Sequence, residues 1–242
     1  GLFADETASR FDFDLIYGNN VSVTIPSSFP TTYPNVHIKG RNGTNRKLVF
    51  EENITINRDL IIRESATLLM SNTVNGDITV ARNLNMTINN GTDQIEFPSS
   101  GPGRVLTISE DINMDNNGDE IRIVDNNSPA DITIHRLSVG GDINQDIGQI
   151  NLYSGTGSDR AQVELELFGD SEATYSRSNN PLMSLFRLLL NKGTDKSTSF
   201  TFNDSFSLNG ETSGSIKSLE LQNGNLILND SELLIKSLSS RV

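Results

Sequence analysis

Apolar residues recur along this chain as doublets, two apolar positions separated by a single residue, and helical periodicity is nearly absent. Successive side chains of a β-strand point to opposite faces, so each doublet predicts a short strand with one buried and one solvated face. Near the C-terminal end, three doublets recur every seven residues. Early doublets are Ile54/Ile56, Leu60/Ile62, Leu68/Met70, Ile78/Val80 and Leu84/Met86.

The gaps between doublets distinguish among all-β folds. An antiparallel sandwich needs strands of about five or six residues with turn signals every 8–12 residues. Here successive doublets often start six or seven residues apart, which leaves room to bend the chain but not to reverse it. Three such sides would make a coil of about 20 residues, and the chain would hold about ten or eleven coils.

We therefore predict an all-β fold, a right-handed parallel β-helix or β-solenoid with short rungs and little or no helix. Inward residues should stack in apolar columns, and backbone groups should pair with the coils on either side. Asn is frequent, and its amide can form ladders where successive turns superpose. The residues expected to carry the core are Ile54, Ile56, Leu60, Ile62, Phe200, Phe202, Leu226 and Leu228.

Residues 36–57 and 188–209 align without a gap at an offset of 152, and their apolar doublets coincide. An internal repeat of this kind indicates a modular, extended architecture. We predict a solenoid unit over 1–175 and the start of a second copy over 176–242, continuous with the first and continuing beyond the chain. The polar stretch 169–181 marks the boundary. The segment 185–190, LFRLLL, has helix-forming composition, but its repeat partner is β-like, so we predict a strand there.

Composition narrows the classes of function. The net charge of −12 and the pI of about 4.6 oppose binding to the phosphates of nucleic acid. The longest apolar run, PLMSLFRLLL, has ten residues and contains Arg187, whereas a membrane-spanning helix needs about 20. We expect neither nucleic-acid binding nor membrane insertion. The chain has no Trp and four Tyr, so strong glycan binding by this segment alone is not expected, although outward Thr and Asn offer a hydrogen-bonding face.

Residues that could carry catalysis are few. The chain has no Cys and no G-x-S-x-G motif, and His37 and His135 are both predicted on outward positions. Carboxylates crowd one stretch together with Arg122, and paired carboxylates serve polysaccharide lyases and hydrolases. Short gaps leave little chain for groove walls, so a solvated turn face is the simpler interpretation and we predict no enzyme. The carboxylates of that stretch are Asp111, Asp115, Asp119, Glu120 and Asp125.

The segment 113–118, NMDNNG, matches the opening of a calcium-binding loop. Its candidate ligands are Asn113, Asp115, Asn117 and Asp119. The position that should supply the closing bidentate acid is Val124, and a turn rich in Asp, Asn and Gly has the same composition. Calcium is the one cofactor that the sequence suggests, and no other metal site or cofactor is predicted.

Several stretches resemble segments of very large secreted surface proteins of the Bacteroidota, including adhesin-like proteins exported by the type IX route. The resembling stretches are YPNVHIKG, KLVFEENITINRDLIIRESATLLM, LLLNKG, FTFNDSFSLNG and SLELQNGNLILNDSELLI, roughly half of the chain. The resemblance implies an extracellular location at the bacterial cell surface and a role in adhesion, gliding or display. The partners it implies are adjacent solenoid segments, a surface glycan or the secretion machinery.

A structural and display segment with an adhesion or stalk role is the leading hypothesis. No catalytic motif accompanies the resemblance, so no site residue is carried across from it. The first alternative is a polysaccharide lyase or hydrolase built on a β-helix. The second alternative is an element like a phage fibre or tailspike, which predicts an oligomer in solution.

Overall fold

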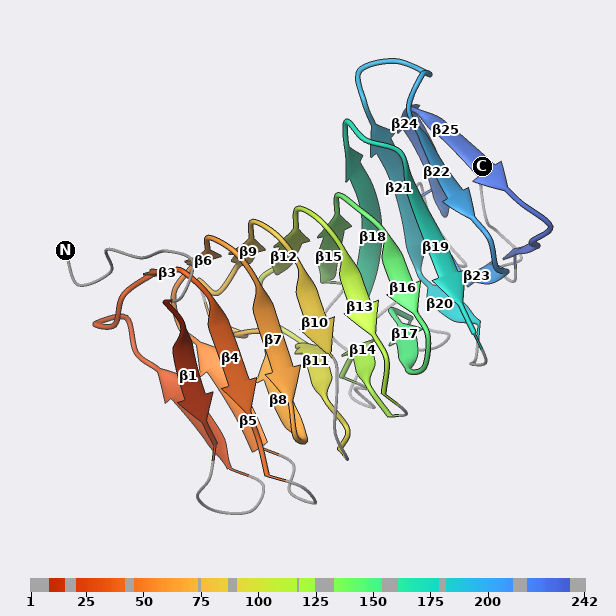
Figure 1. Ribbon diagram of the computed structural model, residues 1–242. Helices are drawn as coiled ribbons and strands as arrows, with labels where there is room; N and C mark the ends of the chain where they lie inside the picture. Colours follow the sequence, from red (N-terminus) through yellow and green to blue (C-terminus); the bar gives the residue numbers. More distant parts are fainter. Residues whose placement is uncertain are drawn as a thin grey trace.

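The computed structural model describes residues 9–15, 21–41, 46–73, 75–86, 91–116, 118–124, 133–153, 161–178, 182–210 and 217–235. In these residues the chain forms 26 β-strands and no helix (Figure 1). The strands assemble into three sheets of nine, nine and eight strands, here called sheets A, B and C. Neighbouring strands within each sheet are parallel.

Each sheet takes every third strand of the chain. Sheet A contains β1 (Phe11–Asp14), β4 (Val36–Lys39), β7 (Leu60–Arg63), β10 (Leu84–Met86), β13 (Ile112–Met114), β16 (Ile143–Gln145), β19 (Ala173–Arg177), β22 (Ser199–Phe202) and β25 (Asn225–Leu228). Sheet B contains β2 (Ser22–Ile25), β5 (Arg46–Phe50), β8 (Ala66–Leu69), β11 (Gln94–Phe97), β14 (Glu120–Ile123), β17 (Gln149–Asn151), β20 (Met183–Leu185), β23 (Phe206–Leu208) and β26 (Leu233–Ile235). Sheet C contains β3 (Thr32–Tyr33), β6 (Ile54–Ile56), β9 (Ile78–Val80), β12 (Val105–Ile108), β15 (Ile134–Val139), β18 (Gln162–Gly169), β21 (Arg187–Lys192) and β24 (Leu219–Asn223).

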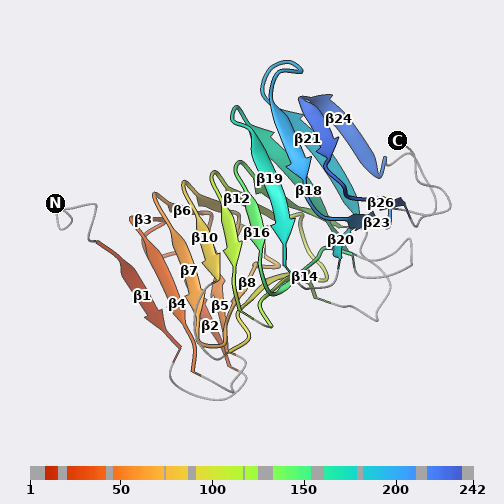
Figure 2. The same cartoon turned by 45° about the vertical axis from the view of Figure 1, so that its right-hand side comes forward.

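The chain visits sheets A, B and C in turn and so winds as a right-handed coil from one end of the molecule to the other (Figures 1 and 2). Each strand, apart from the two at the ends of each sheet, is hydrogen-bonded to the equivalent strand of the coil before it and of the coil after it. The predicted right-handed parallel β-solenoid is confirmed. Its doublets form strands because two inward side chains per side are enough to fill the narrow interior.

The coils are longer than the sequence spacing predicted. Equivalent positions of successive coils are 20 apart at the shortest, between Leu48 and Leu68, and 33 apart at the longest, between Asn151 and Ser184; most spacings exceed 22. No sheet holds more than nine strands in the described residues, so the predicted coil of about 20 residues and the count of ten or eleven coils were wrong. The shortest gaps between doublets represent single corners of a coil, whereas other corners carry longer loops.

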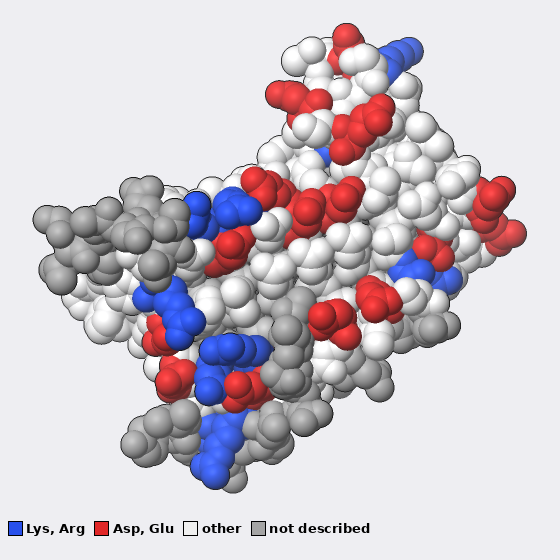
Figure 3. Space-filling model, viewed as in Figure 1, with Lys and Arg blue, Asp and Glu red and all other residues white. Residues whose placement is uncertain are grey.

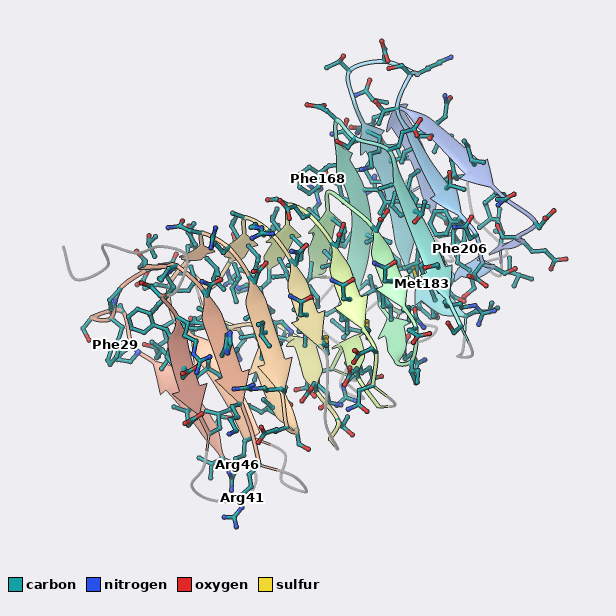
Figure 4. The ribbon with its side chains drawn as sticks, in the orientation of Figure 1. Phe29, Arg41, Arg46, Phe168, Met183 and Phe206 are labelled. Atoms are coloured by element: carbon teal, nitrogen blue, oxygen red, sulfur yellow. The ribbon has the colours of Figure 1, made fainter. Side chains whose placement is uncertain are left out.

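The core is the column of inward side chains along the axis. Among the residues expected to form it, Ile54, Ile56, Leu60, Ile62, Phe200 and Phe202 are buried. Leu226 is partly buried against the core and Leu228 is 41 % exposed, because β25 is the outermost described strand of sheet A. Inward pairs such as Met183 and Phe206, labelled in Figure 4, lie in register on β20 and β23.

The two copies of the sequence repeat lie on different sides of the solenoid. Val36–Lys39 is in sheet A, whereas the aligned Arg187–Lys192 is in sheet C. The aligned Ile54–Ile56 and Phe206–Leu208 are in sheets C and B. The offset between the copies therefore spans a whole number of sides but not of coils. The similarity reflects the rule that every side obeys, two inward apolar residues between corners, and not superposed modules.

The predicted boundary between 175 and 176 falls inside β19, which pairs with β16 and with β22. The stretch 169–181 thus carries a strand of the continuous solenoid, and Tyr175 within it is fully buried. The segment 185–190 is extended, as predicted, but it belongs to two strands. Phe186 forms the corner between β20 and β21, and its side chain is buried.

Asn and Asp side chains connect successive coils at the corner that leads into sheet A. Each side-chain Oδ1 accepts a hydrogen bond from the backbone N–H of the equivalent residue one coil later, so it replaces the strand pairing that the bend interrupts. The acceptors Asn35, Asp59, Asn83, Asp111 and Asp142 receive the N–H groups of Asp59, Asn83, Asp111, Asp142 and Thr174 at 3.3, 3.2, 3.1, 2.7 and 2.7 Å.

A second ladder runs along the outer face of sheet A. The Nδ2 of Asn113 donates to Oδ1 of Asn85, and the Nδ2 of Asn144 donates to Oδ1 of Asn113, both at 2.9 Å. The hydroxyl of Ser176 extends the row to Asn144 at 3.4 Å. The high Asn content of the chain is therefore explained in part by contacts between coils, where amide side chains stack in register.

Candidate functional site

A groove with a volume of about 420 Å³ opens on the outer face of sheet B, over β2, β5 and β8. Its floor is formed by outward side chains of these three strands. Ser22 and Thr24 come from β2, Lys47 and Val49 from β5, and Leu69 from β8. Ser22 is in register with Lys47, and Thr24 with Val49, so the floor runs along the solenoid axis.

The walls of the groove are two short segments that follow sheet B strands in adjacent coils. Ser71, Asn72 and Thr73 come after β8, and the segment Pro98, Ser99 and Ser100 comes after β11. Asn72 and Thr73 are exposed, whereas Ser71 and Pro98 are buried. The Ser71 and Thr73 hydroxyls are 2.7 Å apart, and the Thr73 N–H donates to the Ser71 Oγ at 3.1 Å.

A buried polar network holds the two walls in place. His135 Nε2 lies 2.8 Å from the carbonyl oxygen of Pro98, and His135 Nδ1 accepts the N–H of Arg104 at 2.9 Å. The Nε of Arg104 donates to the carbonyl oxygen of Ser71 at 2.7 Å. Because Nδ1 is an acceptor, the imidazole is the neutral tautomer with its proton on Nε2, which donates to Pro98. One histidine and one arginine thus join both walls to sheet C.

His135 occupies an inward position and is fully buried, so its predicted outward placement was wrong. The inward residues of β15 are His135, Leu137 and Val139, and Ile134 faces outward. The ring of His135 packs 5.8 Å from the ring of Phe97. His37 faces outward and is half-buried, with Nδ1 3.5 Å from Asp12 Oδ1. Burial lowers the pKa of His37, and the negative charge of Asp12 opposes that shift.

A row of charges continues from the groove along the outer face of sheet B. Glu96 has a side-chain exposure of 1 %, and both of its oxygens are bound by cations. Lys47 pairs with Oε2 and Arg122 pairs with Oε1, the latter at 2.6 Å. Arg122 also lies 3.1 Å from Glu120. The charge of the Glu96 carboxylate is therefore neutralised by cations on both sides along the sheet, and the ammonium of Lys47 forms its ion pair with Glu96.

The carboxylates that crowd the sequence at 111–125 do not converge in the structure. Asp111 is in the corner ladder before sheet A, Asp115 is exposed after β13, and Asp119 is buried before sheet B. Glu120 lies on the face of sheet B beside Arg122, and Asp125 falls outside the described residues. The stretch passes around two corners of a coil, so its described acids are distributed over the corner before sheet A, the corner before sheet B and the outer face of sheet B.

The residues predicted for calcium are likewise separated. Asn113 is in the amide ladder of sheet A, and the Oδ1 of the buried Asp119 accepts the N–H of Asp93 at 3.3 Å. Asp115 is exposed, and Asn117 lies outside the described residues. Over the described part of the chain, no group of three or more His, Asp or Glu side chains is arranged to hold a metal ion. The strand β13 explains the separation, because it draws Asn113 into a sheet.

Two carboxylic acids that the sequence did not single out as a pair, Asp93 and Asp119, are stacked in adjacent coils at the corner before sheet B. Asp93 is fully buried, and its Oδ1 accepts the N–H groups of Ser65 and Ala66 at 2.9 and 3.3 Å. Burial raises the pKa of Asp93 to about 6. Burial, followed by the charge of Asp93, raises the pKa of Asp119 to about 8. The Oδ2 of each has no hydrogen-bond partner.

Sheet C carries a row of alternating charges on its outer face. Glu164, with 2 % of its side chain exposed, lies between Arg136 at 2.9 Å and Arg187 at 2.7 Å. Arg187 continues the row to Glu220 at 2.5 Å. Each partner comes from the next strand of the sheet, so these ion pairs join neighbouring coils. Opposite charges directly across strands stabilise a sheet, and like charges would destabilise it.

Charge is unevenly distributed over the face that Figure 3 displays. Basic side chains gather toward the N-terminal coils, and acidic side chains predominate over the middle and C-terminal coils.

A buried cation lies on sheet C, where the Nζ of Lys192 donates to the carbonyl oxygen of Gly140 and lies 6.0 Å from the Phe200 ring. Burial lowers the pKa of Lys192, while Asp142, Asp111 and Asp170 act to raise it.

No family model, curated protein or solved structure matches the chain. Among the described residues, no helix is long and apolar enough to cross a membrane. The site is therefore interpreted from its own chemistry. Its parts are a groove with hydroxyl-bearing walls, a buried network that fixes those walls, and a neighbouring row of fully paired charges.

Proposed function

We propose that the chain is a structural and display segment of a large secreted or cell-surface bacterial protein, with a stalk or adhesion role. The observation that carries this proposal is the unbroken stacking of coils, with apolar columns inside and side-chain ladders and ion pairs linking coil to coil outside. In such a stack each coil stabilises its neighbours, and stability adds along the axis. A rigid rod of this kind extends and presents whatever it is joined to.

The mechanical part of this proposal is tested by pulling the chain between reference domains in single-molecule force spectroscopy. Equivalent positions of successive coils are 20 to 33 apart in the sequence, so release of one coil should lengthen the chain by about 65–115 Å. A stiff spacer should resist until whole coils or blocks of coils unravel in such steps. Gradual extension at low force, without steps, would contradict a load-carrying role.

A polysaccharide lyase or hydrolase is the second candidate, and the groove on sheet B is the observation that favours it. Glu51 is the one carboxylate among its described lining residues, and Lys47 is the one cation. Two-carboxylate hydrolysis needs a second acid about 5–10 Å away, and Glu96 nearby is held by two cations. Incubation with a panel of polysaccharides, followed by assays for reducing ends and for unsaturated products, tests this function. Product formation lost in Glu51→Gln would establish it.

A further inference from the structure

We propose that the groove on the outer face of sheet B binds a short, uncharged oligosaccharide. This inference deepens the adhesion role of the proposed function and rests on it, because it names the site and the ligand class through which this segment would make contact. It concerns the outer face of the first coils only. The stacking that supports a stalk role involves the whole chain and is independent of it.

The lining has the chemistry that saccharides require. Hydroxyl and amide groups of Ser22, Thr24, Asn72 and Thr73, all of them exposed, supply hydrogen-bond donors and acceptors around the rim. Val49 and Leu69 are outward residues of their strands yet half-buried, and they give the floor an apolar strip. A pyranose has the matching pattern of an equatorial rim of hydroxyls around C–H faces. Pockets for small ligands likewise combine apolar surface with a few placed polar groups.

The charges of the groove favour a neutral ligand. Its one described cation, Lys47, is paired with the buried Glu96, so its charge is already neutralised. Glu51 adds an anionic group to the lining, and the one described lining cation is already paired with Glu96 and does not balance it. An acidic polysaccharide would meet net repulsion here. A neutral glycan meets no such penalty and can use the Glu51 carboxylate as an acceptor.

The walls are fixed before any ligand arrives. Arg104 binds the carbonyl oxygen of Ser71 in one wall, and His135 binds the carbonyl oxygen of Pro98 in the other. Arg104 is 3 % exposed and His135 is fully buried, so both are part of the packed interior. The affinity of a weak ligand is reduced least when the side chains and loops of its site do not have to be ordered on binding.

The size of the groove sets the length and affinity of the ligand. A volume of about 420 Å³ lies in the range of small-molecule sites, about 300–1,000 Å³, and suits two or three sugar units. The described lining has no aromatic residue, so the dissociation constant should be about 1 mM. Binding at this strength contributes to adhesion when many copies act together on one surface.

The experiment uses the whole chain labelled with ¹⁵N and titrated with neutral tri- to hexasaccharides of glucose, mannose, galactose and N-acetylglucosamine. Oligogalacturonates and an extended polar peptide serve as the charged and non-glycan probes. We expect at least one neutral series to shift the amide resonances of Ser71, Asn72, Thr73 and Thr24, with saturation in the millimolar range. Shifts caused only by the oligogalacturonates, only by the peptide or by no probe would overturn the proposal.

Variants assign the binding to the groove. Thr24→Tyr places a ring over the floor, and Tyr is well suited to a strand, so the solenoid should be retained. Its matched control is Thr201→Tyr, an outward threonine on sheet A. We expect Thr24→Tyr to weaken binding at least tenfold and the control to bind as the wild type does. Equal binding by both variants would refute the site.

A second pair of variants does not alter a strand. Asn72→Ala removes an amide from the rim, and Asn229→Ala removes an exposed amide from the far end of sheet A. Asn72→Ala should lower the affinity three- to tenfold, and Asn229→Ala should leave it unchanged. A larger loss of affinity in Asn229→Ala than in Asn72→Ala would also refute the site. If no glycan binds while force spectroscopy still shows stepwise release of coils, the adhesion site fails and the structural role stands.

Discussion

Replacing Asp119 by Asn should make this protein less sensitive to pH. Asp119 is 1 % exposed at the corner before sheet B, and its Oδ1 accepts the backbone N–H of Asp93. Asn has the same shape and keeps this acceptor, but it cannot ionise. The charged groups around the site are Asp93 in the adjacent coil, Asp115 on the approach to the corner, and Glu64 beside Asp93. All three are acidic, and all oppose ionisation of the pair.

The direction in which pH changes the stability follows from the raised pKa of Asp119. In the unfolded chain the carboxyl ionises from its ordinary pKa of 3.8 upward, whereas in the folded chain it stays protonated until a pH of about 8. The unfolded state therefore binds fewer protons in this interval, and the free energy of unfolding falls as pH rises. One pH unit is worth about 1.4 kcal/mol, so the wild type should lose about 3 kcal/mol at this residue between pH 5 and pH 7.5.

Urea denaturation followed by circular dichroism at pH 5 and pH 7.5 measures the effect. Asp119→Asn should be close to the wild type at pH 5, because its unpaired amide costs about as much as the buried acid does there. At pH 7.5 it should be more stable than the wild type, with a relative gain of about 3 kcal/mol between the two conditions. Asp146→Asn, an exposed acid in the following coil, is the control and should differ little from the wild type at either pH. A stability difference between Asp119→Asn and the wild type that stays constant with pH would refute the reasoning.

Three further substitutions test the packing between coils. Ile56→Asp places a charge in the fully buried core of sheet C and should cost about 4 kcal/mol or more, and an unchanged melting temperature would show that Ile56 does not face inward. Glu164→Gln leaves Arg136 and Arg187 without their shared anion and should cost about 1–3 kcal/mol in urea denaturation, whereas a loss below about 0.5 kcal/mol would mean that the row on sheet C contributes little. Asn113→Ala interrupts the half-exposed amide ladder and should cost about 1 kcal/mol or less, and a larger loss would mean that the ladder stabilises the coils more than its exposure suggests.

The architecture was predictable because one rule is repeated along the whole chain. Two inward apolar residues per side, with gaps too short for reversal, exclude most antiparallel folds and leave a solenoid. The length of a coil was not predictable in the same way. A short corner and a long corner both satisfy the rule. The length of a coil becomes known only from the strand pairing, such as that of Ile143 with Tyr175.

Inward and outward positions were predictable only where doublets were grouped into the correct strands. In the sequence Ile132 and Ile134 also form an apolar doublet, and taking both as inward places His135 outward. Continuing the alternation backward from Leu137 and Val139, which are inward, places His135 inside, as the structure does. The correct alternation was present in the sequence. Ile134 and Leu137 face opposite sides of the strand, however, so the face assigned to His135 depends on which of the two is taken as inward. At β25 the alternation was correct, yet Leu228 remains exposed because burial also requires a further strand beyond it.

The groove could not be predicted from local sequence. Its walls, at Ser71 and Pro98, come from different coils and become neighbours only when the register of sheet B is known. The network through Arg104 and His135 crosses between sheets B and C in the same way. The carboxylates of 111–125 illustrate the opposite error. They are close in sequence but lie around two corners, so proximity along the chain gave no common site.

The most direct test of the proposed role is the size and exposure of the native polypeptide. An antibody raised against this segment would be used on a denaturing blot of whole cells, before and after protease treatment of intact cells. The segment itself has a mass of 26.5 kDa. A surface stalk predicts a band far above that mass, and the band should disappear after protease treatment. A band near the mass of the segment that resists the protease would contradict the account and favour a self-contained protein, for which the polysaccharide screen becomes the next experiment.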